Sequence, residues 1–179
     1  MLSKHTHKVQ RGFSLIEILI SLVVLSIGLL GLGGLQLTSL KSANNAHFRT
    51  TASIAATELA DRMRLNPSAV ASALYEREMN RTTCADTDTT KSCDGDNLCS
   101  STEAAAYDMK TAACGRTLGG ERNGGVFYQL PNSGLAVNCG TITCNSGVEH
   151  TIIIDWSEVD DDDEDTEVQA RSYELNFIP

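Results

Sequence analysis

The sequence predicts an α+β fold in which a long N-terminal helix packs on a small antiparallel β-sheet that carries disulfides. An apolar run begins at Phe13 and passes into an amphipathic segment that ends at Asn66-Pro67, which indicates one long helix. The last third of the chain alternates apolar and polar residues, as half-buried strands do. All six cysteines follow the apolar run, and an even number in an exported domain favours disulfide bonds.

Length and charge limit the functions open to the chain. Its 179 residues allow one modest domain with an extension. The formal net charge is −9, and no basic patch follows the first residues. Because a nucleic-acid-binding surface needs such a patch, we expect no nucleic-acid partner.

The apolar run is long enough to cross a membrane. From residue 13 to residue 40 the only charged side chain is Glu17. As a helix these 28 residues would be about 42 Å long, against roughly 30 Å of hydrocarbon. Lys4, Lys8 and Arg11 precede the run and a mostly acidic chain follows it. We therefore expect the N-terminus in the cytoplasm and the bulk of the protein on the far side of the membrane.

The residues alone leave three interpretations of this segment. A secretory signal peptide has an apolar stretch of only about 7–15 residues and a small-x-small cleavage site, which the sequence after Leu40 lacks. A simple membrane anchor explains the length but not Glu17, because a charge in hydrocarbon costs roughly 2.5–3.5 kcal/mol. A leader removed ahead of the apolar run leaves Glu17 close to a new N-terminus.

The motif Gly12-Phe13-Ser14-Leu15-Ile16-Glu17 resembles the processing site of type IV pilins and pseudopilins. The resemblance implies that a prepilin peptidase cuts between Gly12 and Phe13, that Phe13 is N-methylated, and that Glu17 is the assembly carboxylate. It divides the chain into a cleaved basic leader (1–12), a transmembrane and assembly helix (13–40), its periplasmic continuation (41–66) and a globular head (67–179). In the fibre, Glu17 can neutralise the terminal amine of a neighbouring subunit.

The stretch from Gly28 to Pro67 narrows the resemblance to minor pilins called type IV pilus modification proteins, the PilV type. That family implies an assembly protein rather than an enzyme, with prepilin peptidase, other major and minor pilins and the inner membrane as partners. It implies a single-pass inner-membrane protein that later joins the pilus fibre on the cell surface. Two alternatives remain open: a minor pseudopilin of type II secretion, and an adhesin or ligand-binding module at the pilus tip.

Glycines interrupt the spanning helix. Gly34 stands where major pilins usually have a proline. This glycine and its neighbours either loosen the helix, since each helical glycine costs about 1 kcal/mol relative to alanine, or form a close-packing face. The residues leave both readings open for Gly28, Gly31, Gly33 and Gly34.

Beyond the membrane segment, helical spacing predicts one apolar stripe that covers the sheet, formed by Phe48, Ala52, Ala55, Leu59 and Met63. Glu58 and Arg62 are spaced to form an ion pair. Asn66-Pro67 should end or kink the helix, and Ser68 should cap a short continuation that runs through Met79.

The rest of the head is predicted as one helix and several strands. Residues 102–113 have helical composition, and the glycine-rich 115–125 is interpreted as a loop, because it lacks the Lys-Ser/Thr ending of a phosphate-binding loop. Residues 126–130 and 135–144 are candidate strands. A terminal hairpin is expected between the alternating runs Ile152, Ile154, Trp156 and Tyr173, Leu175, Phe177.

The six cysteines are the disulfide candidates: Cys84, Cys93, Cys99, Cys114, Cys139 and Cys144. They allow 15 complete pairings, among which the spacing favours only Cys139 with Cys144 as a local loop. Zinc is the competing interpretation, but no C-x2-C pair is present and His150 is the only nearby imidazole. We expect no metal and no cofactor.

Residues 158–167 hold eight acids, and a solvated loop tip explains them better than a calcium site. Their spacing lacks the glycine and terminal glutamate of an EF-hand, although calcium binding by this loop stays open. No Ser/His/Asp order or histidine pair appears, and His5 and His7 lie in the leader. We therefore expect no catalytic residues.

Overall fold

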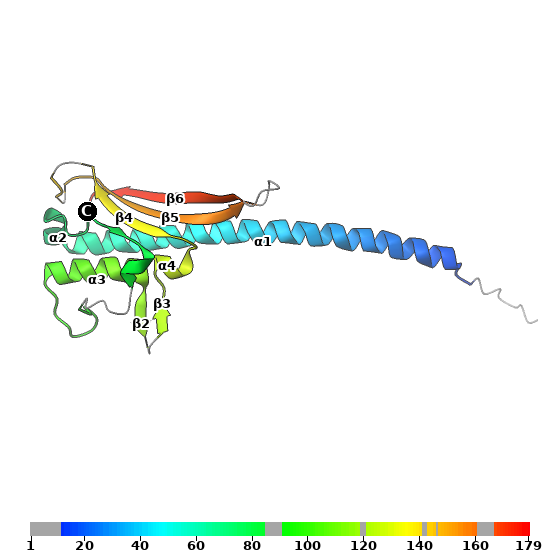
Figure 1. Cartoon of the computed structure of the whole chain (residues 1–179), viewed down its shortest axis with the longest axis horizontal. Coiled ribbons are helices and arrows are strands. Elements are labelled where there is room, and N and C mark those ends of the chain that lie inside the picture. Colours follow the sequence, from blue (N-terminus) through cyan, green and yellow to red (C-terminus); the bar gives the residue numbers. More distant parts are fainter. Residues whose placement is uncertain (1–11, 85–90, 119–120, 141–142, 146, 161–166) are drawn as a thin grey trace, which may run out of the picture. The chain divides into compact units, whose positions relative to one another are not determined.

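The computed structural model describes residues 12–84, 91–118, 121–140, 143–145, 147–160 and 167–179 (Figure 1). The chain divides into two units, Met1–Asn44 and Asn45–Pro179. Helix α1 (Leu15–Leu65) contributes its first part to one unit and its last part to the other. The following paragraphs concern the second unit, which is the head.

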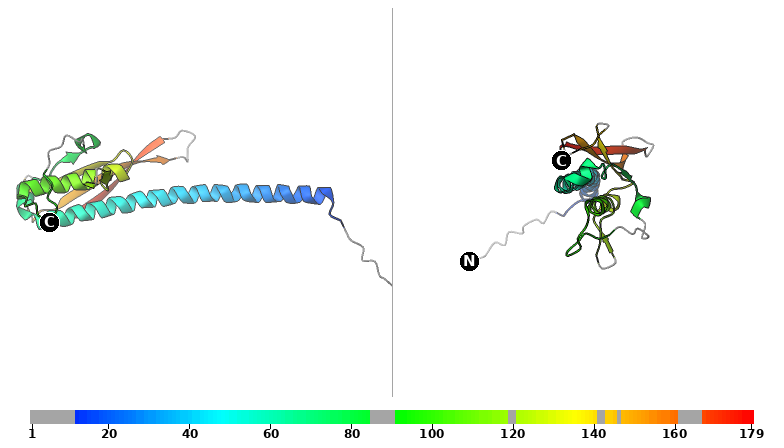
Figure 2. Two further views of the ribbon diagram at one scale, coloured as in Figure 1. Left: turned by 90° about the horizontal axis from the view of Figure 1, so that it is seen from below. Right: turned by 90° about the vertical axis from the view of Figure 1, so that its left-hand side faces the viewer.

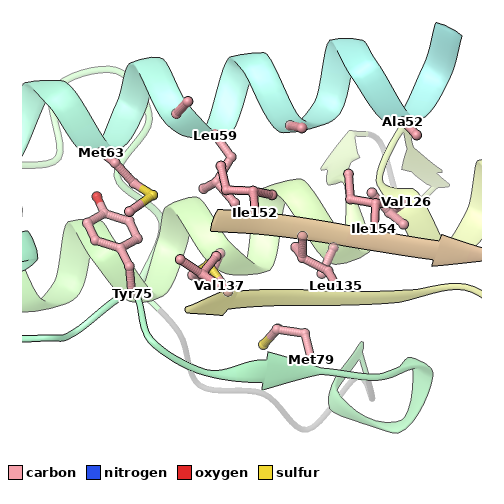
Figure 3. Close-up of a cluster of buried hydrophobic side chains, with 14 of the residues drawn as sticks. Ala52, Leu59, Met63, Tyr75, Met79, Val126, Leu135, Val137, Ile152 and Ile154 are labelled. Carbon is pink, nitrogen blue, oxygen red and sulfur yellow. The ribbon is translucent and has the colours of Figure 1, made fainter. Parts of the chain in front are cut away.

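The last part of α1 packs through one face of small and apolar side chains. Its buried residues are Thr51, Ala52, Ala56, Leu59, Ala60 and Met63. Figure 3 shows Leu59 and Met63 of α1 on the same core as Ile152 and Ile154. The predicted stripe is confirmed, with Ala52, Leu59 and Met63 at its centre and Phe48 and Ala55 partly buried at its margin.

Helix α1 ends at Leu65, directly before the predicted Asn66-Pro67 break. Pro67 opens α2 (Pro67–Ala71), where its missing N–H costs nothing. The expected continuation through Met79 is wrong: α2 stops at Ala71, Ala73 adopts a positive φ of 54°, and the chain enters strand β1 (Glu78–Met79). The N-cap is Asn66, without a side-chain capping bond, rather than Ser68.

Four antiparallel strands form the main sheet in the order β1-β4-β5-β6. The long hairpin is confirmed: β5 (His150–Asp160) pairs with β6 (Glu167–Phe177), with Ile152 opposite Leu175 and Ile154 opposite Tyr173. The alternating residues Ile152, Ile154 and Trp156 are buried, as their period of two requires.

Strand β4 (Gly134–Cys139) is shorter than the expected strand 135–144. A disulfide between Cys139 and Cys144 closes the chain into a loop after β4, so pairing with β5 ends at the Cys139–His150 register.

Helix α3 (Ser101–Cys114) lies beside the head part of α1 (Figures 1 and 2). It confirms the helix expected over 102–113. Ser100 and Glu103 form a capping box, in which the Ser100 hydroxyl accepts from the Glu103 N–H and the Glu103 carboxylate accepts from the Ser100 N–H. A short 3-10 helix, η1 (Arg81–Cys84), precedes the segment that leads to α3.

Two expectations near the glycine-rich segment are wrong. Within the segment expected to be a loop, β2 (Arg116–Leu118) pairs antiparallel with β3 (Glu121–Asn123). The expected strand 126–130 is instead a single helical turn, α4 (Val126–Gln129). Gly125, at the N-cap of α4, has a φ of 80°, and a Cβ there would collide with the backbone of Gly115. This turn buries Val126 and Phe127 against the core.

Candidate functional site

The candidate processing segment lies at the beginning of the described chain. Gly12, Phe13 and Ser14 precede α1, and the Phe13 side chain is 82% exposed. The carbonyl of Ser14 accepts bonds from the N–H groups of Glu17 at 3.0 Å and Ile18 at 3.4 Å. The junction between Gly12 and Phe13 therefore lies outside the helix, ahead of its first turn.

Glu17 lies in the first turn of α1, and its side chain is exposed. A carboxylate in this position is favoured by the partial positive charge of the helix N-terminus. Within the described part of the chain, no hydrogen bond or ion pair engages the Glu17 carboxylate. The chain thus presents an acid that is compatible with the helix and open to an external cation.

The first part of α1 is long and apolar enough to cross a membrane by length and composition. None of the residues in its most apolar 18-residue window is buried within the chain. Three of its hydroxyls form bonds within the helix: Ser21 and Ser26 each donate at 2.7 Å, and Thr38 at 3.2 Å, to the carbonyl four residues earlier. Each of these three hydroxyl groups therefore donates a hydrogen bond within the helix, as a lipid environment requires.

The four helical glycines are open on the surface of α1. A Cβ built at Gly28, Gly31, Gly33 or Gly34 would meet nothing within 4 Å. Contacts within the chain therefore give no reason for the missing side chains, and the two interpretations of these glycines both stand.

A buried polar network joins the head part of α1 to α3. Arg62 donates to Asp108 at 3.0 Å and to Glu58 at 2.7 Å, which confirms the expected Glu58–Arg62 pair. Tyr75 donates its hydroxyl proton to Asp108 at 2.8 Å. Burial, and then the neighbouring Asp108 carboxylate, raise the pKa of the Tyr75 hydroxyl above its ordinary value of 10. This network holds the two helices in register.

All six cysteines are paired. Cys84–Cys114 joins η1 to the end of α3, with a sequence separation of 30 between the partners. Cys93–Cys99 closes a loop before α3, and Cys139–Cys144 is the local pair that the spacing favoured. The Cys84–Cys114 pair could not be chosen from the sequence, because its partners meet only when η1 packs on α3.

The acidic run 158–167 begins inside the sheet rather than in a loop. Glu158 is buried, and it accepts bonds from Trp156 Nε1 at 2.8 Å and Arg171 Nε at 3.3 Å. The expectation of a solvated side chain at position 158 is therefore wrong. Residues 161–166 lie outside the described residues, so calcium binding there stays untested.

Comparison with known families matches two adjoining segments of the chain. Residues 7–33 match the prokaryotic N-terminal methylation motif, and residues 34–110 match the family described as type IV pilin Tt1218. Comparison with curated proteins and with solved structures found no match. Pilin families are structural proteins, and the methylation motif implies processing by a prepilin peptidase and assembly with other pilins. The two matches and the fold are consistent with a prepilin-like type IV pilin.

Proposed function

We propose that this prepilin-like chain is a minor pilin of a type IV pilus, which enters, initiates or modifies the fibre through helix–helix packing. One observation carries the proposal: a methylation motif at 7–33 adjoins a pilin match at 34–110. The apolar helix across that junction buries none of its most apolar residues within the chain. A helix of this kind needs lipid before assembly and neighbouring subunits after it.

Processing by prepilin peptidase would fall between Gly12 and Phe13. The cut would remove a leader that carries Lys4, Lys8 and Arg11 and no acid, and would leave a new amine on Phe13. The chain would then be a single-pass inner-membrane protein with a periplasmic head, ready to join the fibre on the cell surface.

In the fibre, Glu17 would pair with the amine of a neighbouring subunit. Four residues separate Glu17 from Phe13, about 6 Å along a helix axis, so one subunit can offer both charges close to the same depth in a bundle. An ion pair away from water is favourable only with good geometry, and losing one partner typically costs about 3–5 kcal/mol. Glu17 would therefore set the register of neighbouring helices more than their affinity.

The proposal is tested by intact-mass and quantitative mass spectrometry of sheared pili. We expect a mature chain that begins at Phe13 with one added methyl group and is present in far fewer copies than the main subunit. A Gly12→Leu variant should retain its leader and be missing from the pili, whereas Ser3→Ala in the leader should behave as wild type. A mature mass that still includes residues 1–12 would overturn the pilin assignment, and a copy number equal to that of the main subunit would overturn the minor role.

The same strains separate the two neighbouring alternatives. If deletion of the gene abolishes secretion of folded exoproteins and leaves piliation intact, the chain is a pseudopilin of type II secretion. If pili that lack only residues 67–179 of this subunit assemble normally but no longer adhere, the head is a binding module at the tip.

A further inference from the structure

Four side chains from three segments meet beside the end of strand β4. A carboxylate oxygen of Glu76 and the Sγ atoms of Cys139 and Cys144 lie within 4.8 Å of one another. His150, the register partner of Cys139 on β5, places Nε2 3.8 Å from Oε1 of Glu76. We refer to Glu76, Cys139, Cys144 and His150 as the Glu76 cluster.

The cluster brings a ring nitrogen and a carboxylate oxygen close together. The His150 side chain is 1% exposed, and its Nδ1 lies 2.9 Å from the carbonyl of Val148. Because a carbonyl only accepts, Nδ1 carries a proton, and Nε2 is the ring nitrogen that is placed to bind a metal ion. Oε1 of Glu76 is buried and, within the described residues, has no hydrogen-bond partner. Nε2 and Oε1, 3.8 Å apart, are therefore two ligand atoms that one metal ion can engage together.

We propose that the Glu76 cluster is a redox-gated zinc site, in which reduction of the Cys139–Cys144 disulfide lets both thiolates bind Zn²⁺ together with Glu76 and His150. The inference extends beyond pilus assembly, because it concerns the head alone.

The donor set matches what zinc takes. Zinc binds thiolate sulfur at about 2.3 Å, imidazole nitrogen at about 2.0–2.1 Å and carboxylate oxygen at about 2.0–2.2 Å, in a tetrahedron. In a tetrahedron with these bond lengths, a nitrogen and an oxygen on one ion lie about 3.4 Å apart. The observed 3.8 Å between His150 Nε2 and Glu76 Oε1 is about 0.4 Å wider, so a small rotation of the Glu76 side chain brings both atoms into ligand geometry. The bond from Nδ1 to a backbone carbonyl is also the usual support of a zinc-bound histidine.

The redox step needs a dithiol reductant. The dithiol transfers two electrons and two protons to the Cys139–Cys144 bond and becomes a disulfide itself, which leaves two cysteine thiols. Zinc binding then releases both thiol protons to solvent. Reoxidation by an external disulfide, which takes two electrons from the thiolates and two protons from solvent to become a dithiol, re-forms the Cys139–Cys144 bond and expels the ion. In the oxidised head the disulfide sulfurs are not thiolates, and the cluster holds no zinc.

The test uses the purified full chain in detergent, with Zn²⁺ as the probe and a chromophoric chelator as competitor. Under a dithiol reductant, wild type should bind one more zinc equivalent than Cys139→Ser/Cys144→Ser, which keeps the other four cysteines. Glu76→Gln should weaken binding by at least about tenfold. The matched control is Glu78→Gln, an exposed acid two residues away, which should bind as wild type does.

Cobalt provides a second readout that does not depend on the cysteine variants folding. Reduced wild type should give the intense visible bands of a tetrahedral cobalt–thiolate centre, whereas Glu76→Gln and His150→Gln should give altered or weak bands. If reduction unfolds the head, added zinc should restore its folding in wild type but not in Glu76→Gln. Equal zinc binding by reduced wild type and the double serine variant, or by wild type and Glu76→Gln, would overturn the proposal.

Discussion

At the residue scale, Glu17 is an acid with no partner among the described residues of its own chain. It is exposed in the first turn of α1, and none of the described side chains pairs with it. The helix N-terminus tolerates it there, but an apolar helix gains nothing from a charge in the membrane. A carboxylate kept in such a place is best explained by a cation on another molecule, which under our proposal is a subunit's terminal amine.

Replacing Glu17 with Leu should reduce incorporation into pili by at least about tenfold, because the amine of a neighbouring subunit would lose its partner in the fibre core. Membrane insertion, cleavage and head folding should be unchanged. The measurement is co-purification with the other pilins at matched membrane levels.

The matched control is Glu58→Gln, which removes an acid of α1 that is 61% exposed and already paired with Arg62. This variant should be incorporated as wild type is. Equal incorporation of Glu17→Leu and wild type would reduce Glu17 to an incidental charge on a membrane anchor.

Tyr75 supports the head through its bond to the buried Asp108. Tyr75→Phe should lower the free energy of unfolding by about 1–3 kcal/mol, because Asp108 loses a donor while it remains buried. Tyr107→Phe makes the same change on a partly exposed tyrosine of α3, and it should cost less. Denaturant unfolding of the three proteins at neutral pH measures both effects.

The difference in unfolding free energy between wild type and Tyr75→Phe should depend on pH. Burial raises the pKa of Tyr75 in the folded state above 10, so the unfolded chain loses this proton first as the pH rises. The contribution of Tyr75 to stability is therefore complete below about pH 10 and declines above it. The stability difference between wild type and Tyr75→Phe should shrink only in alkaline solution. A difference that shrinks on acidification to pH 6 would contradict this assignment.

At the element scale, the disulfides hold segments that have little secondary structure of their own. Cys84–Cys114 ties η1 to the end of α3 across 30 residues, whereas Cys93–Cys99 spans 6 residues. A cross-link that closes a longer loop restricts the unfolded chain more strongly.

Replacing both cysteines of the Cys84–Cys114 bridge with serine should therefore lower the free energy of unfolding by about 3–4 kcal/mol. The same replacement in Cys93–Cys99 should lower it by about 2 kcal/mol. Denaturant unfolding gives the order, and abundance in an oxidation-deficient periplasm should follow it. The Cys93–Cys99 variant is the control for replacing two bridged cysteines when only a short loop is opened. The reverse order would mean that native-state strain, and not loop closure, decides the contribution of each bridge.

At the scale of the whole molecule, the two units differ in whether their apolar side chains are buried within the chain. In Met1–Asn44 the described large apolar side chains are exposed, up to 86% at Leu15, whereas Asn45–Pro179 has a core in which many side chains are fully buried. The head can fold on its own contacts, while the first unit depends on lipid or on other helices. Loss of the leader would take the net charge from −9 to −12, since three cations and no acid are removed.

Several parts of this architecture could be read from local patterns. The spanning helix, its end before Pro67, the α1 stripe and the β5–β6 hairpin each follow from a period or a breaker within a single segment. The processing motif also lies within six consecutive residues, 12–17, and needs no tertiary information to be recognised.

The missed elements depend on distant partners. Residues 126–130 have the composition of a strand, but they form a helical turn because Gly125 turns the chain and the core accepts Val126 and Phe127 in that shape. Likewise, the continuation through Met79 fails because residues 78–79 pair with β4. The capping box of Ser100 and Glu103 was a local signal that could have located the start of α3.

The sequence by itself determined the long apolar helix, the N-terminal methylation motif, the terminal hairpin and the disulfide-bearing character of the head, because each depends on the order of neighbouring residues. Only the tertiary structure decided that Cys84 pairs with Cys114, that Glu158 is buried, and that Glu76 and His150 face each other beside Cys139. These relations join positions separated by up to 74 residues, from Glu76 to His150, and depend on how the strands and helices pack. The helical or strand periodicity of apolar residues within one segment does not predict such packing, since these contacts form only when the whole core is assembled.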